Sequence, residues 1–514
     1  MEAQDYRMSG IPAIDLFAGP GGLGEGFSQA GFDIRLSIEC DPEAQQTLQL
    51  RAFCRSLLKK ESGLESLNRF FENGAKLANF YNEYPSIASH AKNEAWLAKL
   101  GTTPNSEVDE RIRVGLRGVE KWVLIGGPPC QAYSLVGRAR MRGTNPDFEE
   151  DHRHFLYKEY LRIVEEHRPT VFVMENVKGI LSANVKETAI FAQILSDLRA
   201  PTRALKKRRL AQGEVEYELH SISESTDTLG DDFEPKQFLV RAEDFGVPQK
   251  RHRIFIVGIR KGTGIAMNYL KRSESLTSVG NVIGDLPKLR SGFSRALVGD
   301  WVVSIEGIRK EPWFRSLAKT EPQLFQMLDF ELRQLDRVQN NGSNIAKMSL
   351  RSKPKRLAEW YRKLNLPFVL NHECRNHMAG DLQRYFYAAC YSKVYHKSPK
   401  ILDFPRQLWP AHANVQNSEG KVIFDDRFRV QCENGSSTTV VSHISKDGHY
   451  YIHPDPRQCR SLTVREAARL QTFPDDYFFT GPRTAQFHQV GNAVPPYLAF
   501  QIATALKKSL AENK

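Results

Sequence analysis

The stretch 14-IDLFAGPGGLGEGF-27 decides the fold class of this chain. An apolar run ends in a glycine-rich turn, and a segment with apolar residues at helical spacing follows. The pattern G-x-G-x-x-G is met by Gly19, Gly21 and Gly24. Glycines in this pattern let backbone amides approach a ligand at the start of a helix. We therefore expect a strand at 11–17, a helix at 22–32 and a ligand-binding turn between them.

A second strand is expected at 34–39, where Ile34, Leu36 and Ile38 alternate with other residues before Glu39. An acid that ends the second strand can accept hydrogen bonds from ribose hydroxyls. Phe17 stands just before the turn, where its ring can stack on an adenine. These features indicate a ribose-bearing cofactor, and by themselves they fit an NAD enzyme equally well.

Further apolar runs predict strands at 122–125, 170–174 and 253–259. Alternating strands and helices predict an α/β fold: a Rossmann-like, parallel sheet with helices on both faces. Residues from about 50 to 120 carry helical spacing and no motif, so we expect a helical insertion there. Residues 200–237, which include 223-SESTDTLGDD-232, are expected to form a polar excursion.

The chain has 514 residues, which is long for one core. The βαβ rhythm stops after residue 264, so we predict a catalytic, cofactor-binding domain at 1–264 and a smaller mixed domain at 265–456. Residues 457–514 are predicted to return to the first domain. No run of about 18 apolar residues and no secretory pattern is found, so we expect a cytoplasmic protein without a membrane segment.

A formal net charge of +12 favours a polyanionic partner, because lysines and arginines that neutralise phosphates release counterions. The seven cysteines include no C-x-x-C pair, which argues against a disulfide framework or a zinc finger. The cluster 372-HECRNH-377 is the one group that raises the question of a metal. It lacks a second ligand pair at zinc-finger spacing, so we predict no metal site.

The stretch 122-WVLIGGPPCQAYSLVGR-138 places Cys130 after a strand and two stiff prolines. A thiolate that acts as a nucleophile needs a fixed direction and a polarising neighbourhood. The next strand ends in Glu175 and Asn176, and an acid at such an apolar position can stay protonated and donate a hydrogen bond to a ring nitrogen. In 249-QKRHR-253, Arg251 and Arg253 alternate with His252, so both are expected on one face.

Six motifs in this order resemble the DNA (cytosine-5) methyltransferases of bacterial restriction–modification systems: 15-DLFAGPGG-22, 127-GPPCQAYS-134, 175-ENV-177, 249-QKRHR-253, 460-RSLTVREAARLQTFP-474 and 489-QVGNAVP-495. The resemblance implies the fold of S-adenosylmethionine-dependent methyltransferases, with that cofactor and with cytosine in double-stranded DNA as substrate. It also implies that residues 265–456 form the target-recognition domain. Two departures are Cys40, where the family often has a large aromatic, and the acidic contact to the adenine amino group, which the insertion obscures.

Residue by residue, the resemblance implies three sets. The catalytic residues would be Cys130, Glu175, Arg251 and Arg253. The cofactor-binding residues would be Phe17, Ala18, Gly19, Pro20, Gly21, Gly22, Glu39, Leu156, Asn492, Ala493 and Val494. The substrate-binding residues would be Pro128, Gln131, Ser134, Arg138 and Gln249.

In the implied reaction, Cys130 adds to C6 of a flipped cytosine and Glu175 bonds N3. Arg253 holds the ring carbonyl, Arg251 supports the thiolate and the DNA backbone, and the carbonyl of Pro128 accepts from the exocyclic amine. The segment 132–148 is expected to act as a lid over DNA, with Ser134 and Arg138 near phosphates.

Sequence choice is expected to lie within 265–456, with 351-RSKPKRLAEWYRK-363 and 436-SSTTVVSHISKDGH-449 as candidate contacts. We expect a monomer, and a restriction endonuclease as a genetic partner. Three alternatives stay open on the sequence: a nicotinamide-dependent dehydrogenase, a DNA-binding protein without catalysis, and an RNA substrate.

Overall fold

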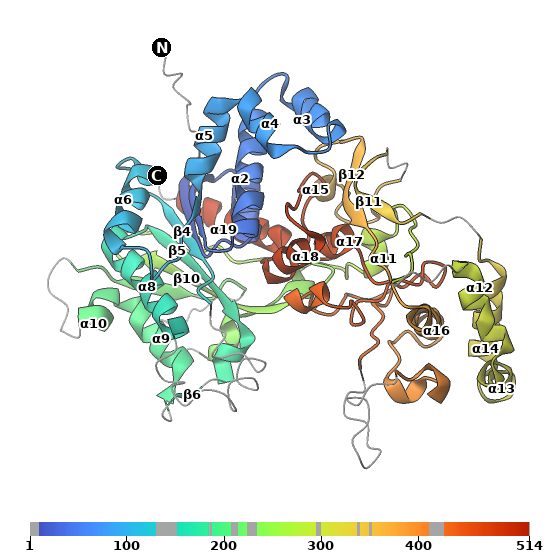
Figure 1. Ribbon diagram of the computed structural model, residues 1–514. Helices are drawn as coiled ribbons and strands as arrows, with labels where there is room; N and C mark the ends of the chain where they lie inside the picture. Colours follow the sequence, from blue (N-terminus) through green and yellow to red (C-terminus); the bar gives the residue numbers. More distant parts are fainter. Residues whose placement is uncertain are drawn as a thin grey trace.

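An eight-stranded sheet forms the centre of the computed structural model, which describes residues 10–129, 152–182, 184–185, 188–206, 214–223, 234–294, 300–336, 340–348, 352–410 and 426–512 (Figure 1). The strand order is β3-β2-β1-β4-β5-β10-β8, and β9 also pairs with β10. The strands are β1 (Pro12–Leu16), β2 (Asp33–Glu39), β3 (Ala95–Leu97), β4 (Val123–Gly126), β5 (Val171–Val177), β8 (Tyr217–His220), β9 (Leu239–Arg241) and β10 (His252–Arg260).

The sheet is parallel from β3 to β5 and antiparallel beyond it. Leu16 pairs with both Ile38 and Gly126, so β1, β2 and β4 end at one level. β10 runs antiparallel to β5, β8 and β9. The expected strands are therefore present, and three further short strands of this sheet, β3, β8 and β9, were not predicted. β3 lies inside the stretch expected to be wholly helical, and β8 lies inside the expected polar excursion.

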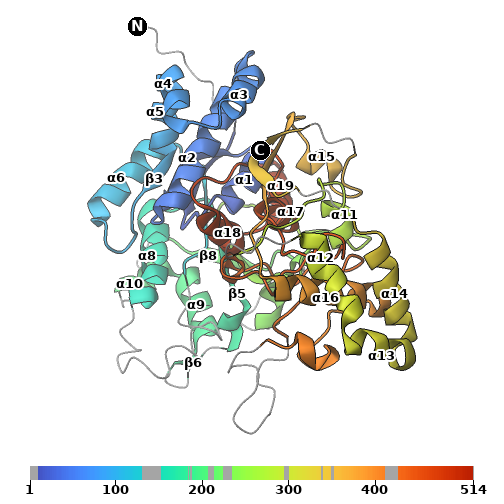
Figure 2. The same cartoon turned by 45° about the vertical axis from the view of Figure 1, so that its right-hand side comes forward.

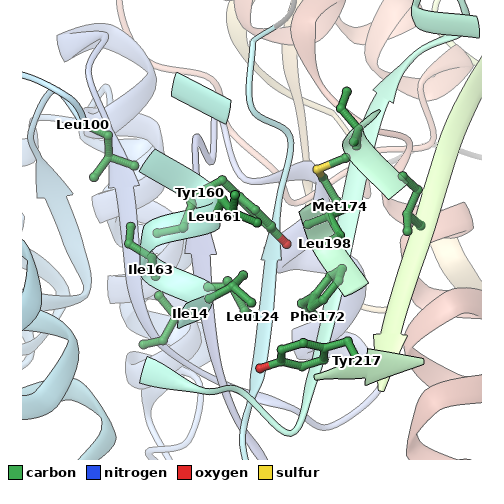
Figure 3. Close-up of a cluster of buried hydrophobic side chains, with 14 of the residues drawn as sticks. Ile14, Leu100, Leu124, Tyr160, Leu161, Ile163, Phe172, Met174, Leu198 and Tyr217 are labelled. Atoms are coloured by element: carbon green, nitrogen blue, oxygen red, sulfur yellow. The ribbon is translucent and has the colours of Figure 1, made fainter. Parts of the chain in front are cut away.

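Helices cover both faces of the sheet, as predicted. On one face, α6 (Asn105–Leu116), α8 (His152–His167) and α9 (Ile190–Arg199) pack on one alternate set of strand side chains. Figure 3 shows part of this core, with Ile14, Leu124 and Phe172 facing Tyr160, Leu161 and Leu198. On the other face, α1 (Gly22–Gln29) and α19 (Pro496–Ala511) cover the opposite set, which includes Val123 and Val173. The alternation of buried side chains on each strand thus produces two cores.

Four helices follow β2: α2 (Pro42–Leu57), α3 (Gly63–Glu72), α4 (Leu77–Glu83) and α5 (Pro85–Glu94). Proline occupies the first turn of α2 and of α5, where its missing N–H has no helical partner. The buried aromatic rings of these helices include Phe53, Phe71 and Phe80, and they share a core with Phe368 and Phe478. The helices after β2 are therefore joined by hydrophobic packing to parts of the chain about 300 to 400 residues later.

The later part of the chain contains two further cores. In one, α12 (Trp301–Glu306), α13 (Pro312–Thr320) and α14 (Pro322–Arg333) pack on α16 (Ala379–Tyr395). Figures 1 and 2 both place these helices on the side of the molecule opposite α6 and α8. The other core joins α11 (Val279–Ile283) and α15 (Ala358–Tyr361) with α17 (Val464–Leu470) and α18 (Arg483–Asn492).

β11 (Gly342–Lys347) and β12 (Phe368–Glu373) form a separate two-stranded sheet, as do β6 (Asn184–Val185) and β7 (Thr188–Ala189). The division into domains at residues 264 and 456 stays a prediction. In the described parts of the chain, no helix is both long enough and apolar enough to span a membrane.

Candidate functional site

A cavity of about 840 Å³ opens at the carboxyl ends of the parallel strands. Its walls come from the turns after β1, β2, β4 and β5, and from α18 and residues 441–442. Ligands in open α/β sheets collect at this edge, because the loops that follow parallel strands meet there. The volume is sufficient for a nucleoside-sized cofactor together with a single base.

The turn after β1 has a strained backbone. Phe17 adopts a φ of 56°, which places an aromatic residue in the left-handed region, and Gly19 and Gly21 also have positive φ. Gly22 allows close packing: a Cβ at this position would lie 2.2 Å from the carbonyl oxygen of Val494. Phe17, Gly19 and Pro20, which are expected to contact the cofactor, line the cavity. Such strain commonly persists at functional sites, where the surroundings fix the conformation.

Glu39 ends β2 and faces the same cavity. Its Oε2 accepts a hydrogen bond from the Gly19 N–H at 2.7 Å, and its Oε1 accepts from the N–H groups of Cys40 and Asp41 at 2.8 and 2.7 Å. The carboxylate is therefore held at the junction of the two turns. These bonds use three of the roughly four lone-pair sites of a carboxylate, both on Oε1 and one on Oε2, so Oε2 retains acceptor capacity. This placement suits a group that receives ribose hydroxyls.

Leu156 on α8 and Asn492 at the end of α18 also line the cavity. Five expected cofactor residues lie behind this surface: Ala18, Gly21, Gly22, Ala493 and Val494 are buried, and Gly21 packs on Leu48. Gln471 donates to the carbonyl of Ala493 at 2.6 Å and fixes this part of the backbone. Ala18, Gly21, Gly22, Ala493 and Val494 thus shape the cavity from behind, whereas Phe17, Gly19, Pro20, Glu39, Leu156 and Asn492 face into it.

The turn after β4 brings Gly127, Pro128 and Pro129 to the other end of the cavity. Gly127 leaves room for the Glu175 side chain in its observed position, since a Cβ would lie 2.8 Å from Oε2 of Glu175. The Pro128 carbonyl, which was predicted to accept from the cytosine amine, already accepts from Nδ2 of Asn176 at 3.2 Å. Cys130, Gln131, Ser134 and Arg138, and with them the predicted lid, lie outside the described residues.

Glu175 and Arg253 meet across the pair β5–β10. Arg253 pairs with Val177 in the sheet register, two residues from Glu175 on the same face. Nε of Arg253 lies 3.0 Å from Oε1 of Glu175, and both side chains are about 15% exposed. Burial raises the pKa of Glu175, while the charges of Arg253 and Arg251 oppose the shift. Burial also lowers the pKa of Arg253. The predicted acid and arginine are therefore in contact inside the cavity.

Arg251 is placed differently from the prediction. Its guanidinium is 2% exposed and donates to the carbonyls of Val440 and Gly491 at 2.8 and 3.3 Å. Burial lowers its pKa, and the charge of Arg253 adds to this shift. A group held this way borders the cavity and fixes two backbone segments. It does not fit the predicted contact with the DNA backbone.

Gln249 is a correction to the predicted substrate contacts. It is fully buried and does not line the cavity. Its Nε2 donates to the carbonyl of Leu470 at 3.1 Å and to Oε1 of Gln471 at 2.5 Å, and its Oε1 accepts from the Val440 N–H at 2.7 Å. With these bonds made, Gln249 joins three backbone segments and has no side-chain surface for a substrate.

Several lining residues were not expected from the sequence. Ala98, Lys99 and Leu100 follow the short β3, and Thr484, Ala485 and His488 lie on α18. Val441 and Ser442 come from the candidate recognition stretch 436–449 and reach the cavity wall. No sequence motif indicates any of these eight positions as part of a site. They reach the cavity only because the complete fold brings together segments that are far apart in the sequence.

The second candidate stretch, 351–363, has a structural role in its later half. Nε1 of Trp360 donates to the Thr472 carbonyl at 2.8 Å, and the Tyr361 hydroxyl donates to the Arg469 carbonyl at 2.6 Å. Arg362 pairs with Asp285 at 2.5 Å. These three side chains are therefore engaged within the protein and are not base contacts, while Lys353 and Lys355 stay exposed.

The histidines of the cluster 372-HECRNH-377 are hydrogen-bonded within the protein. His372 bonds Thr463 and the Pro287 carbonyl, both at 2.9 Å, and His377 bonds Ser461. Over the part of the chain that the structure describes, no group of three or more His, Cys, Asp or Glu side chains is arranged to hold a metal ion.

The sequence of the whole chain is similar to that of known proteins. The family model described as C-5 cytosine-specific DNA methylase matches residues 11–59, 96–200 and 208–508. Type II methyltransferase M.Bpa9945I of Bacillus paralicheniformis is 33% identical over 96% of this chain and 98% of its own length. Type II methyltransferase M.AgeI of Thalassovita gelatinovora is 28% identical over 98% of this chain and 100% of its own.

Among solved structures, a candidate DNA modification methyltransferase encoded within an E. coli prophage matches 98% of this chain and 99% of its own chain. The two are 19% identical with a TM-score of 0.51, a likeness that shows a shared fold.

The gap in the family match at 60–95 falls on α3, α4 and α5. These helices lie within the helical insertion predicted at about 50–120, and the extent of that insertion stays a prediction. The fold class and the resemblance drawn from the six motifs are both confirmed. The chain belongs to the C-5 cytosine-specific DNA methylase family.

Proposed function

We propose that this protein transfers a methyl group from S-adenosylmethionine to C5 of a cytosine within a specific double-stranded DNA sequence. The observation that carries the proposal is a single cavity that contains Glu39 at one end and the contacting pair Glu175–Arg253 at the other. A ribose-binding acid and a buried acid–arginine pair in one space suit a cofactor and a base held side by side.

The cofactor end is formed by Phe17, the turn at Gly19 and Pro20, and Glu39, with Leu156 and Asn492 opposite. Phe17 is placed to stack on the adenine, and Glu39 to receive the ribose hydroxyls. Because Gly22 has no Cβ, the backbone of the turn can pack directly against the Val494 carbonyl. When bound, S-adenosylmethionine supplies an electrophilic methyl group.

The base end combines three side chains in our proposal. Cys130 follows Pro129, which lines the cavity, and its thiolate would add to C6 of the cytosine. The new S–C6 bond moves an electron pair toward N3 and C5, so C5 becomes nucleophilic. Glu175, whose pKa burial raises against the opposing charges of Arg253 and Arg251, would donate to N3 and stabilise the charge that develops there. Arg253 would hold the ring carbonyl.

After C5 carries the methyl group, loss of the C5 proton to a base returns the electron pair. The S–C6 bond then breaks, and Cys130 leaves as a thiolate. No described side chain is assigned as that base. Because C6 of a stacked cytosine cannot reach a cavity of this kind, the target base must leave the duplex, as methyltransferases in general require.

We further propose that the enzyme is the modification partner in a restriction–modification system. Support comes from the two relatives above, both named type II methyltransferases. A restriction endonuclease of matching specificity would be a genetic partner, the enzyme would act as a monomer in the cytoplasm, and DNA would be its substrate. The net charge of +12 suits binding to phosphates.

The test is incubation of the purified protein with unmethylated duplex DNA, a matching RNA and S-adenosylmethionine labelled in its methyl group. We expect label in 5-methylcytosine of the DNA, at one recurring sequence when the product is sequenced. Label in another nucleoside, or in the RNA alone, would contradict the proposal.

A further inference from the structure

The cofactor turn needs support from outside itself. Phe17, Gly19 and Gly21 all have positive φ within five residues, and a left-handed conformation costs a residue such as Phe about 1–2 kcal/mol. The turn's own backbone bonds are few: Ala18 N–H donates to the Ile38 carbonyl, and Gly21 N–H donates to the Ala18 carbonyl. A turn of this kind keeps its shape when surrounding groups determine it.

Tyr477 supplies one such group from the far end of the sequence. Its ring is 1% exposed, and its hydroxyl donates a hydrogen bond to the carbonyl of Pro20, inside the turn. The same hydroxyl would lie 3.0 Å from a Cβ at Gly21, so it touches the turn at two adjacent residues. Tyr477 lies between α17 and α18, more than 450 residues from the turn it contacts.

Arg51 on α2 holds Tyr477 and the start of α1 together. Its guanidinium lies over the Tyr477 ring, 4.9 Å from the centroid. Nη2 and Nε bond the two carboxylate oxygens of Glu25 at 2.6 and 2.9 Å, while Nη1 bonds Asp476 at 2.5 Å. Glu25 belongs to the first turn of α1, directly after the glycines. One buried arginine therefore connects the cofactor turn's helix, α2 and the 476–477 segment.

The charges in this group are balanced inside the protein. Burial of Glu25 works against its ionisation, but the charge and hydrogen bonds of Arg51 prevail and hold the pKa of Glu25 at about 2. A fully buried charge is stable only when it is paired and hydrogen-bonded. The side chain of Arg51 is 7% exposed, and those of Glu25 and Asp476 are even less exposed. The three side chains therefore form a buried support and not a surface ion pair.

We propose that Tyr477 and Arg51 are positioning residues that hold the turn from Ala18 to Gly22 in its cofactor-binding shape. This inference rests on the proposed use of S-adenosylmethionine. Neither residue lines the cavity, so their effect passes through Pro20 and Glu25. Loss of the support lowers the fraction of protein whose turn is ready for the cofactor, and apparent affinity falls by that fraction.

The decisive variant is Tyr477→Phe, which removes only the hydroxyl that bonds Pro20. Its matched control is Tyr361→Phe. Tyr361 is also fully buried, also lies beneath an arginine, Arg469 at 5.5 Å, and also donates its hydroxyl to a carbonyl. Tyr361 does not contact the turn. Both variants lose one buried hydrogen bond, so both are expected to fall in melting temperature by a similar amount.

The readout is the dissociation constant of S-adenosylmethionine, measured by titration calorimetry without DNA. We expect Tyr477→Phe to raise it about fivefold, the equivalent of one hydrogen bond, and Tyr361→Phe to leave it unchanged. In turnover assays, KM for the cofactor should rise with Tyr477→Phe while kcat at saturation stays within about twofold, because the group acts on binding. Equal affinity of Tyr477→Phe and wild type would overturn the inference.

A second variant, Arg51→Lys, keeps the charge but loses the two-pronged bond to Glu25. It should also weaken cofactor binding, and the double variant with Tyr477→Phe should lose less than the product of the two single effects. If the changes in the dissociation constant of the two single variants multiply in the double variant, the two residues act independently, which would contradict a shared support. Absence of cofactor binding by wild type would instead refute the proposed function, so the two failures are distinguishable.

Discussion

The substitution Glu175→Gln separates proton donation from hydrogen bonding at the base end of the cavity. Glutamine has nearly the same shape, and its amide can still donate a hydrogen bond to N3 of cytosine, but it cannot transfer a proton. General acid catalysis is typically worth about 10²–10⁴ in rate. We therefore expect single-turnover methyl transfer to fall by at least about 10²-fold in the variant.

The structure indicates that this loss is not one of folding. The substitution leaves Arg253, 3.0 Å from Glu175, without its carboxylate. Breaking a fully buried pair costs about 3–5 kcal/mol, and the residual exposure of about 15% on both side chains lowers that cost. A domain stability of about 5–15 kcal/mol can absorb it. The protein should remain folded at 25 °C with a lowered melting temperature.

The assay is rapid-quench transfer of tritiated methyl groups to a duplex with a single target site, with enzyme in excess. Cofactor affinity serves as the internal control, because Glu39 and Phe17 lie at the other end of the cavity and should be unaffected. Transfer within about threefold of wild type would refute the role of Glu175 as proton donor. Loss of cofactor binding together with transfer would point to a structural defect.

Three further predictions concern the support of the site. In Gly22→Ala the added Cβ would lie 2.2 Å from the Val494 carbonyl oxygen, so the protein should lose about 1–3 kcal/mol of stability and bind the cofactor at least about tenfold more weakly in calorimetry. Gly435→Ala is the control: its added Cβ would have no atom within 4 Å, so stability and cofactor affinity should both stay unchanged. Burial lowers the pKa of His372 and of His453 to about 4, so each histidine contributes stability that is lost as the pH drops from about 6.5 to 4. The buried acids Asp15 and Glu94, whose pKa values burial raises to about 8 and about 7, act in the opposite direction over this range. The pH profiles of urea unfolding for wild type and His453→Gln should therefore differ in slope by about 1.4 kcal/mol per pH unit, and parallel profiles would contradict the prediction. Gln249→Ala leaves the Val440 N–H unpaired, so the variant should lose about 1–3 kcal/mol of stability in thermal unfolding. A loss of DNA affinity at unchanged stability would instead support a contact between Gln249 and the substrate.

Local patterns explain which parts of the fold could be predicted. The strand, glycine turn and helix at 12–29 follow from contiguous sequence, and Glu39 follows from the end of the next apolar run. β3, β8 and β9 were missed because strands of 3, 4 and 3 residues carry too few alternating positions to be distinguished from loops, whereas the equally short β4 was recognised as a continuous apolar run. The place of β3, β8 and β9 in the sheet is decided by pairing with β2 and β10, which the local sequence does not encode.

The same distinction holds at the site. Glu175 and Arg253 were predicted from strand ends, and the antiparallel pairing of β5 and β10 brings them into contact. Gln249 and Arg251 stand in the same motif, yet their partners Leu470, Val440 and Gly491 come from about 190 to 240 residues later. A residue's partners at such separation depend on the complete fold, so the motif indicated their importance and not their contacts.

The proposed reaction depends on a covalent bond between Cys130 and the target cytosine, and this bond can be trapped. A duplex with 5-fluorocytosine at the methylated position cannot lose a proton from C5, so the adduct persists. With S-adenosylmethionine present, wild type should give a denaturant-resistant protein–DNA species whose mass equals protein, DNA strand and one methyl group. Cys130→Ser should give none. The same species with Cys130→Ser, or its absence with an active wild type, would contradict the account.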